Sequence, residues 1–318
     1  MPDPAPRRLG RLAEELEEAG LVEDVDDEWR ALLLEEVDRA LRPPVHEGRV
    51  LSSGTMLDPR SDPATWEAGT QLTMTRGALG QPPLTTARLF ADGLSSWILR
   101  RADGNDEWLL FDRPAGSERD LVVLASVFQA TLVQRHPTGS VRLVGPFGVL
   151  RWQGFRWHHE APASTWVHVV AAGVSGVEAA VLEDMLTFAV HDLGSMHIGA
   201  ILIYRPDRDP GPPVEERLPT PPPLLIRDAT QLAPLRHALA QIDGAAMFDA
   251  EGVLRRLGVR LVPSEAAEQN VAAVKGTRHT SARRYSRDDP RATVIAVSDD
   301  GPVSVFRDGE VLAHSHPE

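Results

Sequence analysis

LAQIDGAAMFDAEGVLRRLGVRLVP, residues 239–263, contains two strand patterns and a turn that carries a carboxylate. The second pattern, GVLRRLGVRLVP, alternates apolar with polar side chains and contains β-branched residues, which is typical of a strand. Asp243 and Gly244 directly precede the first apolar run, AAMF. Because glycine has no Cβ, a ligand can approach the backbone closely there, and the neighbouring carboxylate can hold a metal ion. We therefore expect a binding turn at a strand end.

A second short motif, GTRH, follows at residues 276–279. It combines a glycine turn with a hydroxyl, a guanidinium and an imidazole in four residues. The next segment, SARRYS, has helix-compatible spacing, which brings Arg283 and Arg284 one turn beyond Thr280. A polyphosphate would meet several donors at once in such an arrangement. Taken singly, each motif also has a simpler interpretation: Asp-Gly-Ala is a common turn, and Arg-His is a common surface pair.

The segments around the two motifs extend a strand-and-helix pattern. ATVIAVSDDGPVSVFRDG, residues 292–309, predicts strand structure and places Ser298 at a strand end. HIGAILIY predicts another strand, after a helix expected to open at Ser175 and to close at Gly194. The chain has no Walker-type glycine loop and no GxGxxG motif. A nucleotide site would therefore have to be built in another way.

In this order and with these flanking strands, the motifs resemble the diadenylate cyclase domain, the family that joins two ATP molecules into cyclic di-AMP. The resemblance covers about residues 176–312 and is closest to the DNA-integrity-scanning type. It implies an α/β fold with a mixed β-sheet flanked by helices. The Pro-rich segment 206–223 has the composition of a linker, but the resemblance places it in a long loop inside this domain. One departure is that the usual Arg-His-Arg reads Arg278-His279-Thr280.

The resemblance also implies roles for individual residues. Asp243 would hold Mg²⁺ or Mn²⁺ and help activate the ribose 3′-hydroxyl, Arg278 would bind the triphosphate, and His279 would orient phosphate or metal. Each of two facing domains would bind one ATP, so self-association is required. The positions implied to bind the nucleotide are Gly244, Ala245, Leu261 (through its backbone, at the adenine edge), Gly276, Thr277, Thr280 and Ser298.

The N-terminal half has a different composition, because all seven tryptophans lie before residue 170. We therefore expect a smaller α+β regulatory domain over residues 1–173 and the catalytic domain over residues 174–318. Within the first domain, Ser117 and Asp120 predict the start of a helix that continues through LVVLASVFQATLVQRH. RLFADG and TWVHVVAAG are expected to form strands.

Composition limits the compartment and the partners. The chain lacks cysteine, which excludes disulfides and thiolate metal sites. Its formal net charge of -13 argues against a general nucleic-acid-binding surface. No stretch approaches the about 20 apolar residues of a membrane span, and the N-terminus lacks the apolar core of a signal peptide. We expect a cytoplasmic protein without membrane or nucleic-acid partners.

Three functional hypotheses are open. The first is an active diadenylate cyclase that the N-terminal domain regulates. The second is a catalytically weakened nucleotide-binding module that senses ATP or cyclic di-AMP, because losing one donor to developing charge costs about 3 to 4 kcal/mol of barrier unless Arg283 or Arg284 replaces it. The third is an interaction scaffold with a vestigial cyclase domain.

Overall fold

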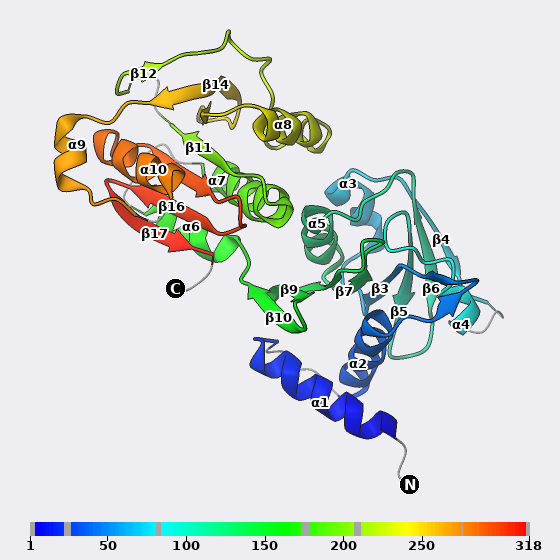
Figure 1. The fold of residues 1–318 in the computed structure, drawn as a ribbon. Coiled ribbons are helices and arrows are strands. Elements are labelled where there is room, and N and C mark those ends of the chain that lie inside the picture. The colour runs from blue at the N-terminus through cyan, green and yellow to red at the C-terminus, as the bar shows by residue number, and fades with distance from the viewer. Residues whose placement is uncertain are drawn as a thin grey trace. The chain divides into compact units, whose positions relative to one another are not determined.

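The computed structural model describes residues 4–21, 27–80, 84–172, 178–206, 211–274 and 276–315. The chain divides into two compact units of similar length, Met1–Pro162 and Ala163–Glu318, and Figure 1 shows the fold of each. Each unit is built on one large β-sheet. Gly173, where the composition suggests a domain boundary, and Ser175 lie outside the described residues. Within the described ranges, no helix combines the length and apolar character that crossing a membrane requires.

The first unit contains an eight-stranded sheet of order β10-β9-β8-β7-β3-β5-β6-β4. β3 pairs with β5 in parallel, whereas the other neighbours pair antiparallel. The strands are β3 (Ser53–Leu57), β4 (Met74–Ala78), β5 (Ser96–Arg100), β6 (Glu107–Phe111), β7 (Thr131–Arg135), β8 (Val141–Gly145), β9 (Gly148–Gln153) and β10 (Arg156–Glu160), and a separate ribbon pairs β1 (Val45–His46) with β2 (Arg49–Val50).

Helices cover both faces of this sheet because its strands alternate apolar side chains between two cores. Leu132 and its neighbours pack against α3 (Trp66–Thr70) and α5 (Glu118–Phe128). Val133 and its neighbours pack against α1 (Pro4–Glu18) and α2 (Asp27–Leu41). Two short helices, η1 (Pro63–Thr65) and α4 (Leu84–Ala87), lie in the connections.

The second unit contains a seven-stranded mixed sheet of order β12-β14-β13-β11-β15-β16-β17. Its central strand β11 is parallel to β13 and antiparallel to β15. The strands are β11 (Ala200–Tyr204), β12 (Val214–Glu215), β13 (Ala245–Phe248), β14 (Leu254–Leu261), β15 (Thr293–Val297), β16 (Val303–Arg307) and β17 (Glu310–His314).

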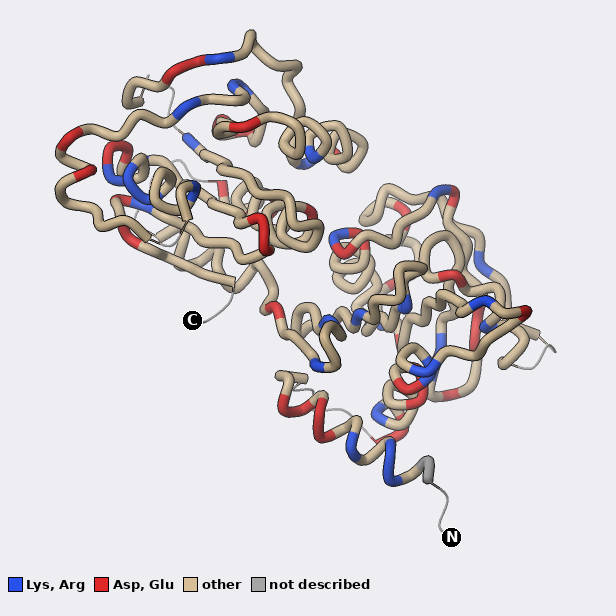
Figure 2. The backbone as a smooth tube through the Cα atoms, viewed as in Figure 1, with Lys and Arg blue, Asp and Glu red and all other residues tan. Residues whose placement is uncertain are grey.

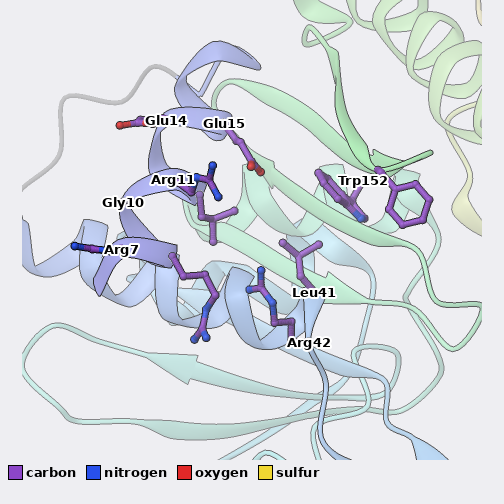
Figure 3. A pocket seen from close by; sticks show the side chains of 11 residues that line it. Arg7, Gly10, Arg11, Glu14, Glu15, Leu41, Arg42 and Trp152 are labelled. Carbon is purple, nitrogen blue, oxygen red and sulfur yellow. The ribbon is translucent and has the colours of Figure 1, made fainter. Parts of the chain in front are cut away.

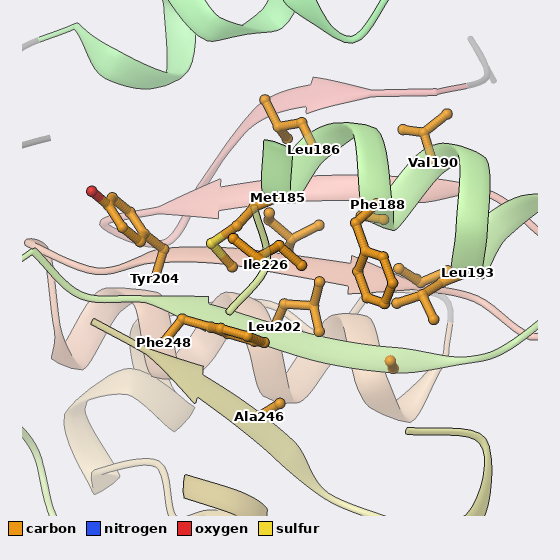
Figure 4. Packing of buried hydrophobic residues seen from close by; sticks show 14 of the residues in the cluster. Met185, Leu186, Phe188, Val190, Leu193, Leu202, Tyr204, Ile226, Ala246 and Phe248 are labelled. Carbon is orange, nitrogen blue, oxygen red and sulfur yellow. The ribbon is translucent and has the colours of Figure 1, made fainter. Parts of the chain in front are cut away.

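Alternation along β11 again fills two cores. Leu202 and Tyr204 face a cluster with α6 (Ser164–Ala171), α7 (Ala179–Thr187), the π-helical turn η2 (Phe188–Leu193) and α8 (Ala229–Gln241), part of which Figure 4 shows. Ile201 and Ile203 face the opposite cluster with α10 (Thr277–Asp288). Two short helices, η3 (Gly194–Met196) and α9 (Glu265–Asn270), complete the unit. The predicted α/β class, with a mixed sheet flanked by helices and preceded by an N-terminal domain, is confirmed.

The helix that begins after Ser117 starts as predicted but ends early. Ser117 accepts a hydrogen bond from the backbone of Asp120, whose side chain bonds back to complete the capping box. The prediction that the helix continues to residue 136 is wrong. Gln129 adopts a left-handed conformation with φ 49°, which ends α5, and the chain then forms β7.

Two predicted strands are also absent. RLFADG ends in a turn, because the carboxylate of Asp92 accepts hydrogen bonds from three successive backbone N–H groups, of residues 94–96. TWVHVVAAG contributes instead to helix α6, whose Val167 and Val170 are buried in the core of the second unit. There, packing of an apolar helix face outweighs the β-propensity of valine.

Candidate functional site

The predicted site residues lie at one edge of the second sheet, the edge at which β11 and β13 begin and β14 and β15 end. The first residue of β11, Ala200, is paired with the last residue of β15, Val297. β13 runs parallel to β11 and therefore begins at the same edge, and β14 runs antiparallel to β13 and ends there. Residues just before β11 and β13 and just after β14 and β15 thus lie along one edge.

Asp243 and Gly244 form the turn that leads into β13, ahead of the buried Ala245. Gly244 has a φ of 112°, and a Cβ there would lie 2.6 Å from the backbone carbonyl carbon of Gly258 on β14. Both the backbone conformation and the neighbouring strand therefore require glycine. The carboxylate of Asp243 is exposed, and it has no ion pair or hydrogen bond with any residue that the structure describes. It is available to a ligand.

Helix α10 brings the second motif to this edge. Gly276 is its N-cap residue, with a φ of 93°, and provides no side-chain cap for the first turn, which begins at the exposed Thr277. N–H groups in the first turn of an α-helix have no intrahelical partner, and the helix dipole adds positive potential there. The GTRH segment therefore offers backbone donors to an anionic group.

Arg278 forms an ion pair that links α10 to the turn after β15. Its Nη1 lies 2.6 Å from Oδ2 of Asp299, in the turn that follows β15. Both side chains lie against Gly199, the residue before β11, where a Cβ would overlap the guanidinium and the carboxylate. Three segments that are distant in sequence meet here because residue 199 has no side chain.

The hydroxyl of Thr280 forms hydrogen bonds with backbone groups at the start of the GTRH turn and in the loop before it. Its hydroxyl lies 2.9 Å from the carbonyl oxygen of Val274 and 3.0 Å from that of Gly276, and it accepts from the N–H of Val274 at 3.1 Å. These contacts span the start of the helix and the loop before it. Thr280 is therefore engaged with the backbone of its own turn.

The two following arginines bond to the backbone elsewhere. Nε of Arg283 donates to the carbonyl oxygen of Gly309 at 2.6 Å, and Nε of Arg284 donates to that of Val271 at 3.4 Å. Arg284 also lies 3.8 Å from a carboxylate oxygen of Glu268. In these positions neither guanidinium stands in for the arginine expected at residue 280.

His279 packs edge-on against Phe306 of β16, with 6.1 Å between the ring centroids. Burial of the imidazole lowers the pKa of His279 below its usual range, and the nearby His314 and Arg278 act in the same direction, against the carboxylate of Asp300. The imidazole is therefore neutral at pH 7. It can accept or donate one hydrogen bond but supplies no charge to a phosphate.

Ser298 and Leu261 complete the edge. The hydroxyl of Ser298 bonds to the carboxylate of Asp300, and its N–H donates to the carbonyl oxygen of Pro302 at 2.9 Å, which closes the turn after β15. Leu261, the last residue of β14, is paired with Val214 of β12. β12 comes from the Pro-rich segment, so residues 214–215 of that segment belong to this sheet.

A divalent cation fits the donors available at this edge. In the described parts of the chain, no group of three or more histidine, cysteine or acidic side chains gathers into a metal cluster. Mg²⁺ and Mn²⁺ prefer oxygen ligands, and Mg²⁺ is commonly held by one or two carboxylates together with substrate phosphates. The exposed carboxylate of Asp243 suits that mode of binding.

Sequence reasoning missed two residues of this edge. Gly199 has a recognisable signal, a glycine directly before a fully buried strand, but its need for glycine comes from side chains that arrive much later in the chain. His197 is exposed with a left-handed φ of 57°, and its Nδ1 would lie 3.6 Å from a Cβ at Gly301.

The fold and this edge define an α/β domain with helix-terminal anion donors and an available carboxylate, features suited to a nucleotide. Residues 187–311 match the family described as "DisA bacterial checkpoint controller nucleotide-binding", and residues 10–160 match the family described as "Probable sensor domain DACNK". Residues 187–311, which lie in the second unit, thus match the model of the diadenylate cyclase (DAC) domain family, whose description is nucleotide-binding. The resemblance drawn from the two motifs is confirmed.

Other comparisons add little. A solved structure described as a hypothetical membrane spanning protein from Bacillus cereus is 17% identical, covers 49% of this chain and 71% of its own length, and has a TM-score of 0.38. A likeness at that level carries no argument about function. No curated protein matches the chain significantly.

We predict that Gly199→Ala impairs nucleotide binding, because the added methyl group would displace the Arg278–Asp299 pair from the sheet edge. Isothermal titration with ATP measures the effect, and we expect a loss of affinity of about tenfold or more. Gly77→Ala is the matched control, since a Cβ at Gly77 meets no atom within 4 Å. Unchanged ATP affinity in the Gly199→Ala protein would contradict this role.

We also predict that Thr280→Val loosens the GTRH turn, whereas Thr280→Ser preserves it. Valine matches threonine in shape but leaves the backbone groups of Val274 and Gly276 without the hydroxyl, at a local cost of about 1 to 3 kcal/mol. Hydrogen exchange of peptides covering residues 270–282 should be faster in the valine variant and unchanged in the serine variant. Equal exchange in both variants would exclude a structural role for the hydroxyl.

Proposed function

We propose that the second unit is a diadenylate cyclase that condenses two ATP molecules into cyclic di-AMP and releases two pyrophosphates. One observation carries the proposal: the sheet register brings Asp243, the GTRH turn and Ser298 to the same edge. The family's nucleotide-binding character supports the choice of substrate class. The proposed catalytic residues are Asp243, Arg278 and His279.

Each residue has a task that its surroundings suit. The first turn of α10 and the guanidinium of Arg278 would bind the triphosphate, and Arg278 would exchange Asp299 for phosphate oxygens. The carboxylate of Asp243 would accept the proton of the ribose 3′-hydroxyl and hold Mg²⁺ or Mn²⁺. Such an ion, when bound, neutralises charge on the phosphates during transfer. The neutral imidazole of His279 would orient a phosphate oxygen.

The reaction requires the second units of two copies of the chain to face each other. The 3′-oxygen of each ATP attacks the α-phosphorus of the other, so that two phosphoester bonds form while two bonds to the leaving pyrophosphates break. One unit holds one ATP and cannot complete the ring, so the partner is a second copy of this chain. We further propose that the first unit regulates the catalytic second unit, in keeping with the description of the family that residues 10–160 match as a probable sensor domain.

A second candidate is a nucleotide-binding module with weak turnover. It is favoured by the bonds of Arg283 and Arg284 to backbone carbonyls, which leave the position of the missing arginine without a substitute. The absent donor would cost about 3 to 4 kcal/mol of transition-state stabilisation. This candidate predicts ATP binding without release of pyrophosphate.

Incubation of the full chain with ATP and either Mg²⁺ or Mn²⁺ tests the proposal, with cyclic di-AMP measured by mass spectrometry. We expect product with both ions and a specific activity that rises with protein concentration, because two copies must meet. Asp243→Asn should abolish turnover while ATP still binds. Asp249→Asn is the matched control, since Asp249 lies at the opposite end of β13. ATP binding without any cyclic product at all protein concentrations would favour the second candidate.

A further inference from the structure

A cavity of about 890 Å³ lies within the first unit, and all of its lining residues belong to that unit. It is bordered by helix α1, the end of α2 and the hairpin of β9 and β10 (Figure 3). The volume lies within the range of small-molecule sites, about 300 to 1,000 Å³. The proposed catalytic residues do not contribute to it.

One wall of the cavity is basic although the chain is acidic. Figure 2 shows basic residues toward the N-terminal end of α1 and acidic residues toward its other end. Arg8 and Arg42 share one carboxylate, that of Asp38, which Arg8 contacts through two hydrogen bonds of 2.9 and 2.8 Å. Arg11 has no ion pair with any residue that the structure describes. The wall therefore retains positive charge for an anion.

The opposite wall is aromatic. Trp152 is half-buried and packs at a tilt on Trp157, with 5.2 Å between ring centroids. In Figure 3, Arg11 and Arg42 lie across from Trp152, with Leu41 between Arg42 and the indole. A flat ring could lie on this wall while an attached anionic group reaches the arginines.

Phe155 is the least expected residue of the cavity. It lies at the tip of the β9–β10 hairpin, after Gly154, and both residues have positive φ, 58° and 64°. This two-residue turn favours glycine or asparagine at its second position, so phenylalanine is strained there. Its side chain is also 92% exposed. The fold therefore gains nothing from this ring, whereas a planar ligand in the cavity would cover it.

The cavity also offers an acceptor. Glu15, one turn beyond Arg11 on α1, lines it and forms no ion pair among the described residues. A carboxylate at that place suits an amino group or ring N–H of a base, and it disfavours a bare anion. Cations, aromatic faces and carboxylates together match a ligand with a phosphate at one end and a hydrogen-bonding ring at the other.

We propose that this cavity binds a nucleoside monophosphate, with the phosphate on Arg11 and Arg42 and the base between Trp152 and Phe155. Inorganic phosphate would use only the arginines, and an apolar ligand would leave them unmatched. The sensor description of this family names no ligand, and the cavity supplies a chemical class for one. The proposal does not depend on the second unit being a cyclase.

Calorimetric titration of the full chain carrying Arg278→Ala tests the proposal, because that substitution weakens the nucleotide site of the second unit. The probes are AMP, GMP, CMP and UMP, with inorganic phosphate for comparison. We expect at least one nucleotide to bind about tenfold more tightly than phosphate. Arg11→Ala and Phe155→Gly should each weaken that binding by about tenfold, because each removes one anchor of the ligand.

Phe155→Gly separates binding from folding. Glycine relieves the left-handed strain, so the melting temperature should stay equal or rise while the nucleotide affinity falls. Phe90→Ala and Arg113→Ala, an exposed aromatic residue and an exposed arginine of the same unit outside the cavity, are matched controls and should leave binding unchanged. Absence of binding by all four nucleotides at millimolar concentration would overturn the proposal. So would binding that Arg11→Ala and Phe155→Gly leave intact.

Discussion

The position of β11 between a parallel and an antiparallel neighbour is the constraint on which the candidate chemistry depends. Only this pairing places the starts of β11 and β13 beside the ends of β14 and β15. Parallel neighbours need a long crossover connection, and the segment between β11 and β13, with the Pro-rich stretch and α8, provides it. A shift of one residue in β11 would exchange its two cores and separate Gly199 from Asp299.

Much of this edge could be predicted from the sequence. The Asp243-Gly244 turn, the GTRH helix start and Ser298 each adjoin a segment with a clear strand or helix period, so their places at element ends follow from local patterns. Gly199 could not be predicted, because its requirement for glycine arises from a contact between Arg278 and Asp299. Local patterns failed in the second unit, where the valines of α6 pack in a helix, and in the first unit, where Gln129 ends α5 with a left-handed residue.

In the structure, Thr280 has a role that the comparison with the Arg-His-Arg motif does not show. From the sequence alone, threonine at this position means only that the hydrogen-bond donors of an arginine are lost. In the structure the hydroxyl bonds to the loop that carries Gly276, so the residue stabilises the turn that presents the helix N–H groups and Arg278. Among the described residues of the GTRH motif, positive charge then comes from the guanidinium of Arg278 and the helix terminus, because His279 is neutral. These groups suit the binding of a nucleotide and provide few donors for the charge that develops during its conversion.

The central claim is that the second unit of each copy of the chain supplies half of the reaction, and that two copies together complete it. It is tested most directly by mixing two inactive full-length variants, Asp243→Asn and Arg278→Ala, and analysing the products by mass spectrometry. In a mixed pair, the chain with Asp243 can activate its 3′-hydroxyl toward the phosphate held by the chain with Arg278, but the reverse attack fails. The account predicts a linear dinucleotide triphosphate with one pyrophosphate released, and no such product from either variant alone. A mixture that yields no linear dinucleotide, or a single variant that makes cyclic di-AMP at the unaltered rate, would contradict it.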